Sequence, residues 1–336
     1  MSTKTNLVCL GVIGGAAVGA PHMVGDYWTF ILTAALLWGF TASAWNIAGG
    51  FAGQLSLGHG VYFGAGAYSV AALYNHFEIS PLIGMLLGMG ISAVIATAIG
   101  YVSFRTRLGH LAFAILTLSL SLLVLELVSS SEILGGKVGL FLPAGVSEPW
   151  NLLFASSMGY YYLVLLLILG GTVLQKYLLS QRIGRYWLAI RDNEPAAVAA
   201  GVNPLKYRIL ANVVSGLLTS VAGSIFALTV AYITADSVLA LDVTINIILF
   251  AVVGGLGTIL GPYVGAALLY LLAEYIRSGL GASIDGLNPI LYGGCVLIIV
   301  LLLPGGLVSI PRKVRTLSVN GRQARHEQST TLADAA

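Results

Sequence analysis

Long uninterrupted runs of apolar residues dominate this chain and limit the folds that it can adopt. They fall at about 7–24, 28–48, 58–75, 81–103, 111–130, 160–179, 207–233, 239–257, 259–277 and 287–304. Each is close to the roughly 20 residues that an α-helix needs to cross a bilayer. Only 9% of the 336 residues are charged, against about 25% in soluble domains. This excludes a cytosolic enzyme and a nucleic-acid-binding protein. It also excludes an outer-membrane barrel, whose strands alternate apolar and polar residues. We expect an all-α polytopic membrane protein with about ten transmembrane helices.

The basic residues indicate how such a chain is oriented. With ten spans and both termini in the cytoplasm, all but two of the 16 Lys and Arg residues fall inside, the exceptions being Lys137 and Arg277. This division follows the positive-inside rule. Five helices in each half would make the second half run opposite to the first, so we expect two inverted repeats. The first run could be a signal peptide, but Pro21 makes a poor cleavage site, and we expect a retained helix.

Residues 1–310 are therefore expected to form the transmembrane domain, and the basic segment 311–336 a disordered cytoplasmic tail.

A glycine-rich segment at 44–68 departs from an ordinary lipid-facing helix. It holds seven glycines and the polar side chains of Asn46, Gln54, Ser56 and His59. Irregular backbone at membrane depth must be buried in protein or line a water-filled cavity. One interpretation is a substrate pathway lined by these four residues. The other is a cytoplasmic loop followed by a tightly packed helix, and for His59 a packing role is preferred.

A second segment, 179–208, carries five basic residues and is expected to form a cytoplasmic loop at about 180–207. Asp192 or Asn193 can cap a short helix, which Pro195 suits in its first turn and Gly201 ends. Its alanine-covered face suits docking in a groove of another protein. A helix lying on lipid is the alternative, but no Trp, Phe or Leu occurs between Glu194 and Gly201. The candidate docking residues are Arg191, Asp192, Glu194, Pro195, Ala196, Ala197 and Gly201.

Groups that could perform chemistry are scarce. The sequence has no G-x-x-x-x-G-K-[ST] phosphate-binding loop. Cys9 and Cys295 lie in apolar runs without a Cys/His cluster, so we expect no disulfide, no metal site, no catalytic residue and no cofactor in this chain. We count Glu126 and Glu274 as the ionisable residues inside the spans, both near outer ends. Ion-coupled carriers place charges nearer the midplane, so a conduit powered by a partner is favoured.

Three segments carry a family resemblance. They are 49–59 with 64–68, 189–201, and 254–258 with 261–262. Together, and in this order, they resemble the LivM-like permeases of branched-chain amino acid ABC transporters. The second segment is similar to the coupling loop of bacterial importer permeases, with Pro195 interrupting its EAA-like motif.

The resemblance implies a transmembrane permease subunit of an importer in the bacterial inner membrane, for branched-chain or other neutral amino acids. It implies alternating access driven by partners: a second, LivH-like permease, two ATPase subunits that bind ATP and magnesium, and a periplasmic substrate-binding protein. The family also includes urea and short-amide permeases, so that substrate class stays open. From a different class, an ATPase-independent secondary carrier or channel remains, and it would need no docking helix.

Overall fold

The computed structural model of this chain describes residues 18–106, 109–143, 145, 147–278, 287–302 and 305–309. Most of the first expected span, together with Cys9 and the tail 311–336, lies outside them. The described elements are helices and one pair of short strands. They are α2 (Asp26–Asn46), η1 (Ile47–Phe51), α3 (His59–Phe77), α4 (Pro81–Arg105), α5 (His110–Ser130), η2 (Glu132–Leu134), β1 (Leu140–Phe141), η3 (Pro149–Asn151), α6 (Ser157–Ser180), α7 (Arg182–Asp192), α8 (Glu194–Ala199), α9 (Pro204–Val230), β2 (Tyr232–Ile233), α10 (Ala235–Leu239), α11 (Leu241–Gly254), α12 (Gly261–Ser278), α13 (Leu287–Leu302) and η5 (Leu307–Ser309).

The apolar runs after the first all coincide with helices. Six helical segments of the described chain are long and apolar enough to cross a membrane. They are Asp26–Phe51, Pro81–Ser103, Leu111–Ser130, Ser157–Ser180, Pro204–Val230 and Ala235–Gly254. The described chain is thus consistent with a polytopic all-α membrane protein. The count of ten spans, the inverted repeat and the orientation stay predictions.

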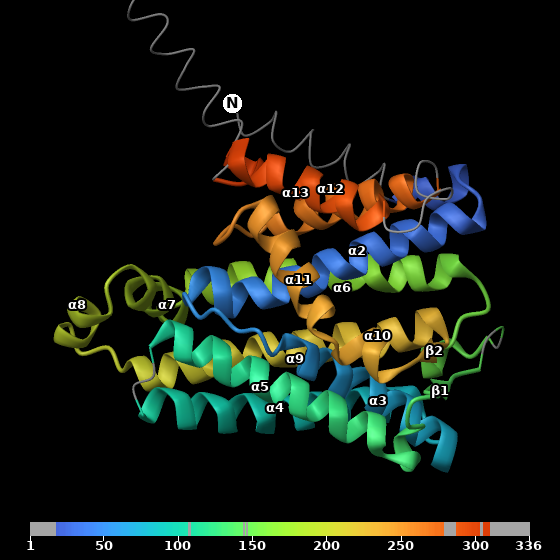
Figure 1. Cartoon of the computed structure of the whole chain (residues 1–336), viewed down its shortest axis with the longest axis horizontal. Coiled ribbons are helices and arrows are strands. Elements are labelled where there is room, and N and C mark those ends of the chain that lie inside the picture. Colours follow the sequence, from blue (N-terminus) through green and yellow to red (C-terminus); the bar gives the residue numbers. More distant parts are fainter. Residues whose placement is uncertain are drawn as a thin grey trace, which may run out of the picture.

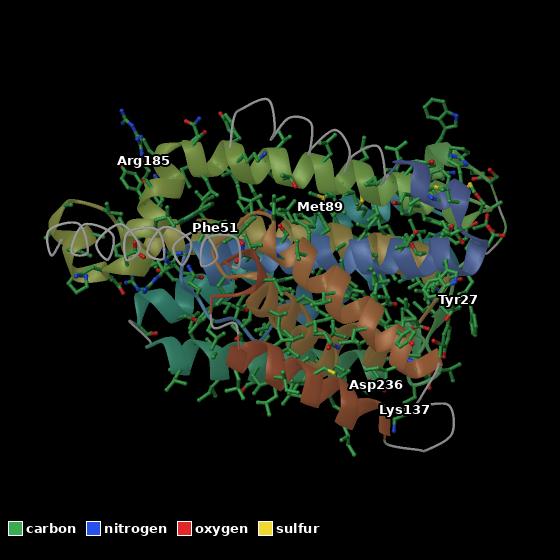
Figure 2. The ribbon with its side chains drawn as sticks, turned by 90° about the horizontal axis from the view of Figure 1, so that it is seen from above. Tyr27, Phe51, Met89, Lys137, Arg185 and Asp236 are labelled. Atoms are coloured by element: carbon green, nitrogen blue, oxygen red, sulfur yellow. The ribbon has the colours of Figure 1, made fainter. Side chains whose placement is uncertain are left out.

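The helices lie side by side, with the polar connections gathered at two opposite ends (Figure 1). The α7–α8 loop forms one end. The antiparallel pair β1–β2, in which Leu140 faces Ile233, lies at the other. Arg185 on α7 lies at the first end, and Lys137, Asp236 and Tyr27 lie toward the second (Figure 2). This separation is the one expected if the α7–α8 end is cytoplasmic.

Glycines allow the central helices to pack with their backbones in contact. The most extensive contacts join α3, α4 and α9. A methyl group at Gly66 on α3 would overlap the carbonyl oxygen of Ser220 on α9, and one at Gly223 would overlap that of Phe63. Close approach of this kind is how helices associate in lipid, where hydrophobic burial gives no driving force. The faces of α4, α5 and α6 are mostly exposed and apolar, as surfaces toward lipid or a second permease must be.

The loop between α6 and α9 contains a helix that the sequence analysis missed. Helix α7 (Arg182–Asp192) places its charged side chains outward and buries Gly184, Trp187 and Ile190. The Trp187 indole Nε1 donates to the carbonyl oxygen of Tyr207 at 2.8 Å. The loop is therefore held against the start of α9 as a folded unit.

Candidate functional site

Asn46, the last residue of α2, connects two glycine-rich segments, the one that follows α2 and the one between α11 and α12. Its side-chain Nδ2 donates to the carbonyl oxygen of Thr258 at 2.8 Å, and its Oδ1 accepts from the Gly257 N–H at 2.9 Å. The residue is fully buried. After it the helix widens into the π-turn η1, where a side chain at Gly50 would overlap the Asn46 amide. The Asn46 side chain thus joins α2 to the α11–α12 connection through hydrogen bonds to its backbone.

Ser56 and His59 form a second buried polar junction, between α2, α3 and α9. The His59 ring contacts the Ser56 Oγ at 2.9 Å through Nδ1 and the Ser215 Oγ at 2.7 Å through Nε2. Ser215 Oγ donates onward to the carbonyl oxygen of Ala44, and Trp45 Nε1 donates to that of Ser56. Both ring nitrogens of His59 are satisfied and no part of it is exposed. This geometry is that of a packing histidine.

Gln54 lies in the non-helical stretch between η1 and α3, where its Nε2 donates to the carbonyl oxygen of Arg208 at 3.1 Å. Only 2% of Gln54 is exposed. All four pathway candidates therefore lie inside the protein rather than toward lipid. Their role in a substrate pathway stays a prediction.

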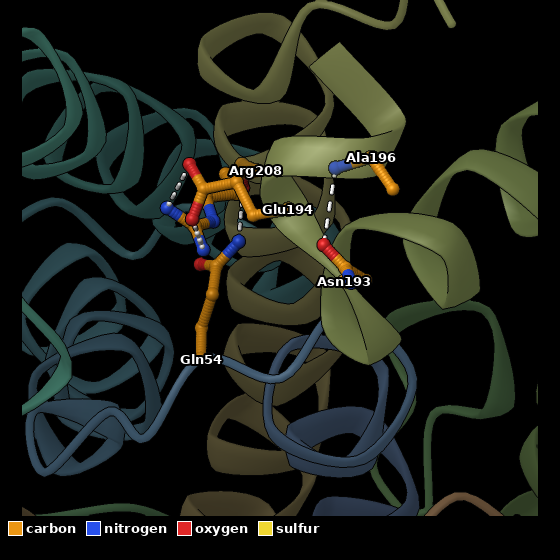
Figure 3. Close-up of polar contacts among 5 residues, drawn as sticks. All are labelled: Gln54, Asn193, Glu194, Ala196 and Arg208. Carbon is orange, nitrogen blue, oxygen red and sulfur yellow. Dashed lines mark hydrogen bonds and ion pairs between the residues drawn. The ribbon is translucent and has the colours of Figure 1, made fainter. Parts of the chain in front are cut away.

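The short helix α8 (Glu194–Ala199) has the caps that the sequence predicted (Figure 3). The side chain of Asn193, rather than that of Asp192, caps it by accepting from the Ala196 N–H at 3.0 Å. Pro195 lies in the first turn. Gly201 has a φ of +83°, the left-handed conformation that ends a helix at glycine. Asn203 then caps α9 through the Lys206 N–H.

Two arginines tie this loop to the break after α2. Arg208 on α9 binds both carboxylate oxygens of Glu194, at 3.2 and 2.8 Å, and the Arg208 side chain is 11% exposed. Because Gln54 bonds the backbone of the same arginine, the three residues form one cluster (Figure 3). Arg191 donates through Nη1 to the carbonyl oxygen of Gly50 at 2.9 Å, and it pairs with Asp192 at 2.9 Å. The sequence analysis missed Arg208, since a contact across 14 residues of loop leaves no spacing signal.

Ala197 is placed differently from the expectation that it faces a docking partner. It is 5% exposed, so it faces this chain. Ala196, Ala199 and Ala200 are exposed, as is Val198, at 51%. On so short a helix the face toward the protein was not readable from the sequence, because alanines occur on both the buried and the exposed sides. The exposed residues of this segment are Pro195, Ala196, Val198, Ala199 and Ala200, and a docking role for them stays a prediction.

The statement that Glu126 and Glu274 are the ionisable residues of the spans is wrong. Asp242 belongs to the 239–257 run and is its one charged residue. It lies in the first turn of α11, just after a break at Ala240, and it is exposed. The isolated acid in an apolar run was the signal that could have found it. Like Glu126 and Glu274, Asp242 lies near one end of its span, so it adds an ionisable residue without placing a charge at the midplane.

A cavity of about 680 Å³ lies beside Asp242, between α2, α11, α12 and α13. Its polar lining comes from Trp38, Asp242, Asn246, Tyr270 and Arg277. None of the four pathway candidates lines it. Among the described residues, no group of His, Cys, Asp and Glu could hold a metal ion.

Comparison with known proteins agrees with these features. The family described as the permease component of the branched-chain amino acid transport system matches residues 27–303. The chain is 26% identical to the LivM high-affinity branched-chain amino acid transport system permease protein of Salmonella typhimurium, over 97% of this chain and 79% of that protein. For LivM of Escherichia coli the identity is 25%, over 96% and 79%. The ribose import permease protein RbsC of Escherichia coli is 27% identical over 61% of this chain and 64% of its own. No solved structure matches the chain.

The matched range begins in α2 and ends just after α13, so it contains the break at Asn46, the α7–α8 loop and the cavity. It also covers more than half of the 336 residues. The chain therefore belongs to the family of permease components of branched-chain amino acid transport systems.

Proposed function

We propose that this chain is the transmembrane permease subunit of an ABC importer for branched-chain or other neutral amino acids. Alternating access would be driven by ATPase partners that dock on α8. A second, LivH-like permease, two ATPase subunits and a periplasmic binding protein would complete the transporter in the bacterial inner membrane. This chain would hold no cofactor and perform no catalytic step, with ATP and magnesium bound by the ATPases.

The observation that supports ATPase coupling is the way in which α8 is anchored. Its exposed face carries only small or medium side chains, at Ala196, Val198, Ala199 and Ala200, which suits a shallow helix-in-groove contact. Its other side is fastened by the Glu194–Arg208 pair to α9. The neighbouring Arg191 reaches the break after α2. A push on α8 would therefore be transmitted to two transmembrane helices.

The LivM relatives support an amino acid as substrate, because branched-chain amino acid transport is what their names state. RbsC, a permease named for ribose, shows that related chains serve another solute class. A urea or short-amide permease is the alternative within the family. A secondary carrier or channel is the alternative from another class, and it leaves the anchored, exposed α8 without a purpose.

Co-purification of this chain with the ATPase subunits of a branched-chain amino acid importer from the same organism tests the proposal. Ala199→Arg adds a long charged side chain to the exposed face of α8, and we expect at least about a tenfold loss of ATPase recovery and of leucine uptake. Gly201→Val forces a β-branched residue into positive φ and should reduce both as well. Gln181→Arg, an exposed position at the start of α7, is the matched control and should retain both.

Normal ATPase recovery and normal uptake with Ala199→Arg would contradict docking on α8. Uptake of leucine by vesicles that contain this chain and its permease partner without any ATPase would favour the secondary carrier instead.

A further inference from the structure

Asp242 lies in an apolar helical segment, where a carboxylate needs a polar neighbour. The span Ala235–Gly254 is broken at Ala240, and the 14 residues of α11 reach only about 21 Å. A hydrocarbon core of about 30 Å is longer than this. At least one end of α11 therefore lies within the hydrocarbon core, and Asp242 belongs to the first turn of this helix. No side chain caps this turn, so its backbone N–H groups also require polar surroundings.

The Asp242 carboxylate is exposed, and no hydrogen bond or ion pair joins it to another residue of the described ranges. An ionised carboxylate facing lipid costs several kcal/mol, on the order of 2.5–3.5 by membrane-insertion scales. It is tolerated where it faces a water-filled space. The cavity between α2, α11, α12 and α13 is that space, since Asp242 and the half-buried Asn246 both line it.

The opposite charge in the same cavity comes from Arg277 on α12. Its side chain is 70% exposed and makes one contact of 3.4 Å, to Glu274. Glu274 is itself held by the Tyr27 hydroxyl at 2.7 Å. The Arg277 guanidinium is thus left with donors free to bind a carboxylate, which it can engage through two parallel hydrogen bonds.

The walls between these charges are apolar. Ile245 and Leu249 line the cavity from α11, and Leu269 lines it from α12. Trp38 forms a rigid wall, because its ring stacks on Phe63 at 5.5 Å between ring centroids. One carboxylate, one guanidinium and an apolar wall match a zwitterion that carries an aliphatic side chain.

We infer that this cavity is a binding site for the transported amino acid. Asp242 and Asn246 receive its α-ammonium, Arg277 receives its α-carboxylate, and Ile245 and Leu249 contact its aliphatic side chain. The inference rests on the proposed function, which it deepens by assigning substrate contacts. It also assigns those contacts to α11 and α12, away from the four bonded polar residues of 44–68.

Substrate protection of a cysteine in the cavity tests the site in the complete transporter. The native Cys9 and Cys295 are first replaced by serine, and Asn246→Cys is introduced. In vesicles, a water-soluble thiol reagent should label Asn246→Cys, and leucine should block that labelling. Adding Asp242→Asn should raise the half-protecting leucine concentration at least about tenfold. The same change should not affect protection by 4-methylpentanoate, which lacks the ammonium group. Asp236→Asn removes an exposed carboxylate from α10 outside the cavity and is the matched control.

Uptake measured on the same vesicles separates this inference from the proposed function. Leucine uptake without protection, or protection by leucine that Asp242→Asn leaves unchanged, would overturn the binding site and leave the importer standing. Protection without amino acid uptake would overturn the proposed importer and leave the site standing.

Discussion

At the residue scale, the Glu194–Arg208 pair shows how one contact fastens a loop to the membrane helices. Both carboxylate oxygens of Glu194 accept from the guanidinium, and the arginine is almost enclosed. Arg208→Ala removes these charge-assisted bonds. Because Glu194 is 39% exposed and regains water, we expect a moderate loss of about 1–3 kcal/mol in unfolding free energy. Thermal unfolding of the purified protein measures it.

Arg185→Ala is the control for this prediction, because Arg185 is an exposed arginine of the same loop. It should change the unfolding free energy by less than about 0.5 kcal/mol. Equal effects at positions 185 and 208 would mean that the Glu194 pair does not fasten the loop.

At the element scale, packing of α3 against α4 and α9 depends on glycine at the crossing points. Gly66→Ala would place a methyl group into the Ser220 carbonyl, which is backbone and cannot move aside. Overpacking of this kind costs about 1–3 kcal/mol. Gly90→Ala on α4 is the matched change, since nothing lies within 4 Å of its added methyl group. That variant should be as stable as the parent or more stable by about 0.5–1 kcal/mol.

Unfolding of the two alanine variants in one detergent gives the comparison. If Gly66→Ala unfolds at the same temperature as Gly90→Ala, the close contact between α3 and α9 is not required for stability.

At the scale of the whole molecule, the basic residues predict the orientation of the chain in the membrane. The end that carries Arg185 lies opposite the end that carries Lys137 (Figure 2). The positive-inside rule assigns the first to the cytoplasm. A reporter fused after Arg325 should therefore be active only in the cytoplasm. A cysteine introduced at Lys137 should react with an impermeant reagent added to the periplasmic side. Periplasmic activity of the reporter would contradict a cytoplasmic C-terminus and with it the predicted ten-span topology.

The sequence by itself determined the membrane class, the helical runs and the position of helix α8, with its N-cap narrowed to Asp192 or Asn193 and its end at Gly201. These follow from local rules: an apolar run of about 20 residues has few alternatives in lipid. Asn193, Pro195, Gly201 and Asn203 act on backbone groups within a few positions of themselves. The family resemblance rested on similarly local motifs, and the family match across 27–303 confirmed it.

Only the tertiary structure decided which polar side chains are hydrogen-bonded inside the protein and which are exposed to a cavity that a ligand could enter. Asn46 is hydrogen-bonded to Thr258, 212 positions further along the chain, and His59 to Ser215, 156 positions further along. Partners this distant leave no pattern in the nearby sequence. Ala197 faces inward because α8 leans on its own chain. Asp242 is exposed to a cavity because α11 begins after the break at Ala240 and α12 packs beside α11. Burial depends on contacts between distant helices, and those contacts exist only once the helices have packed.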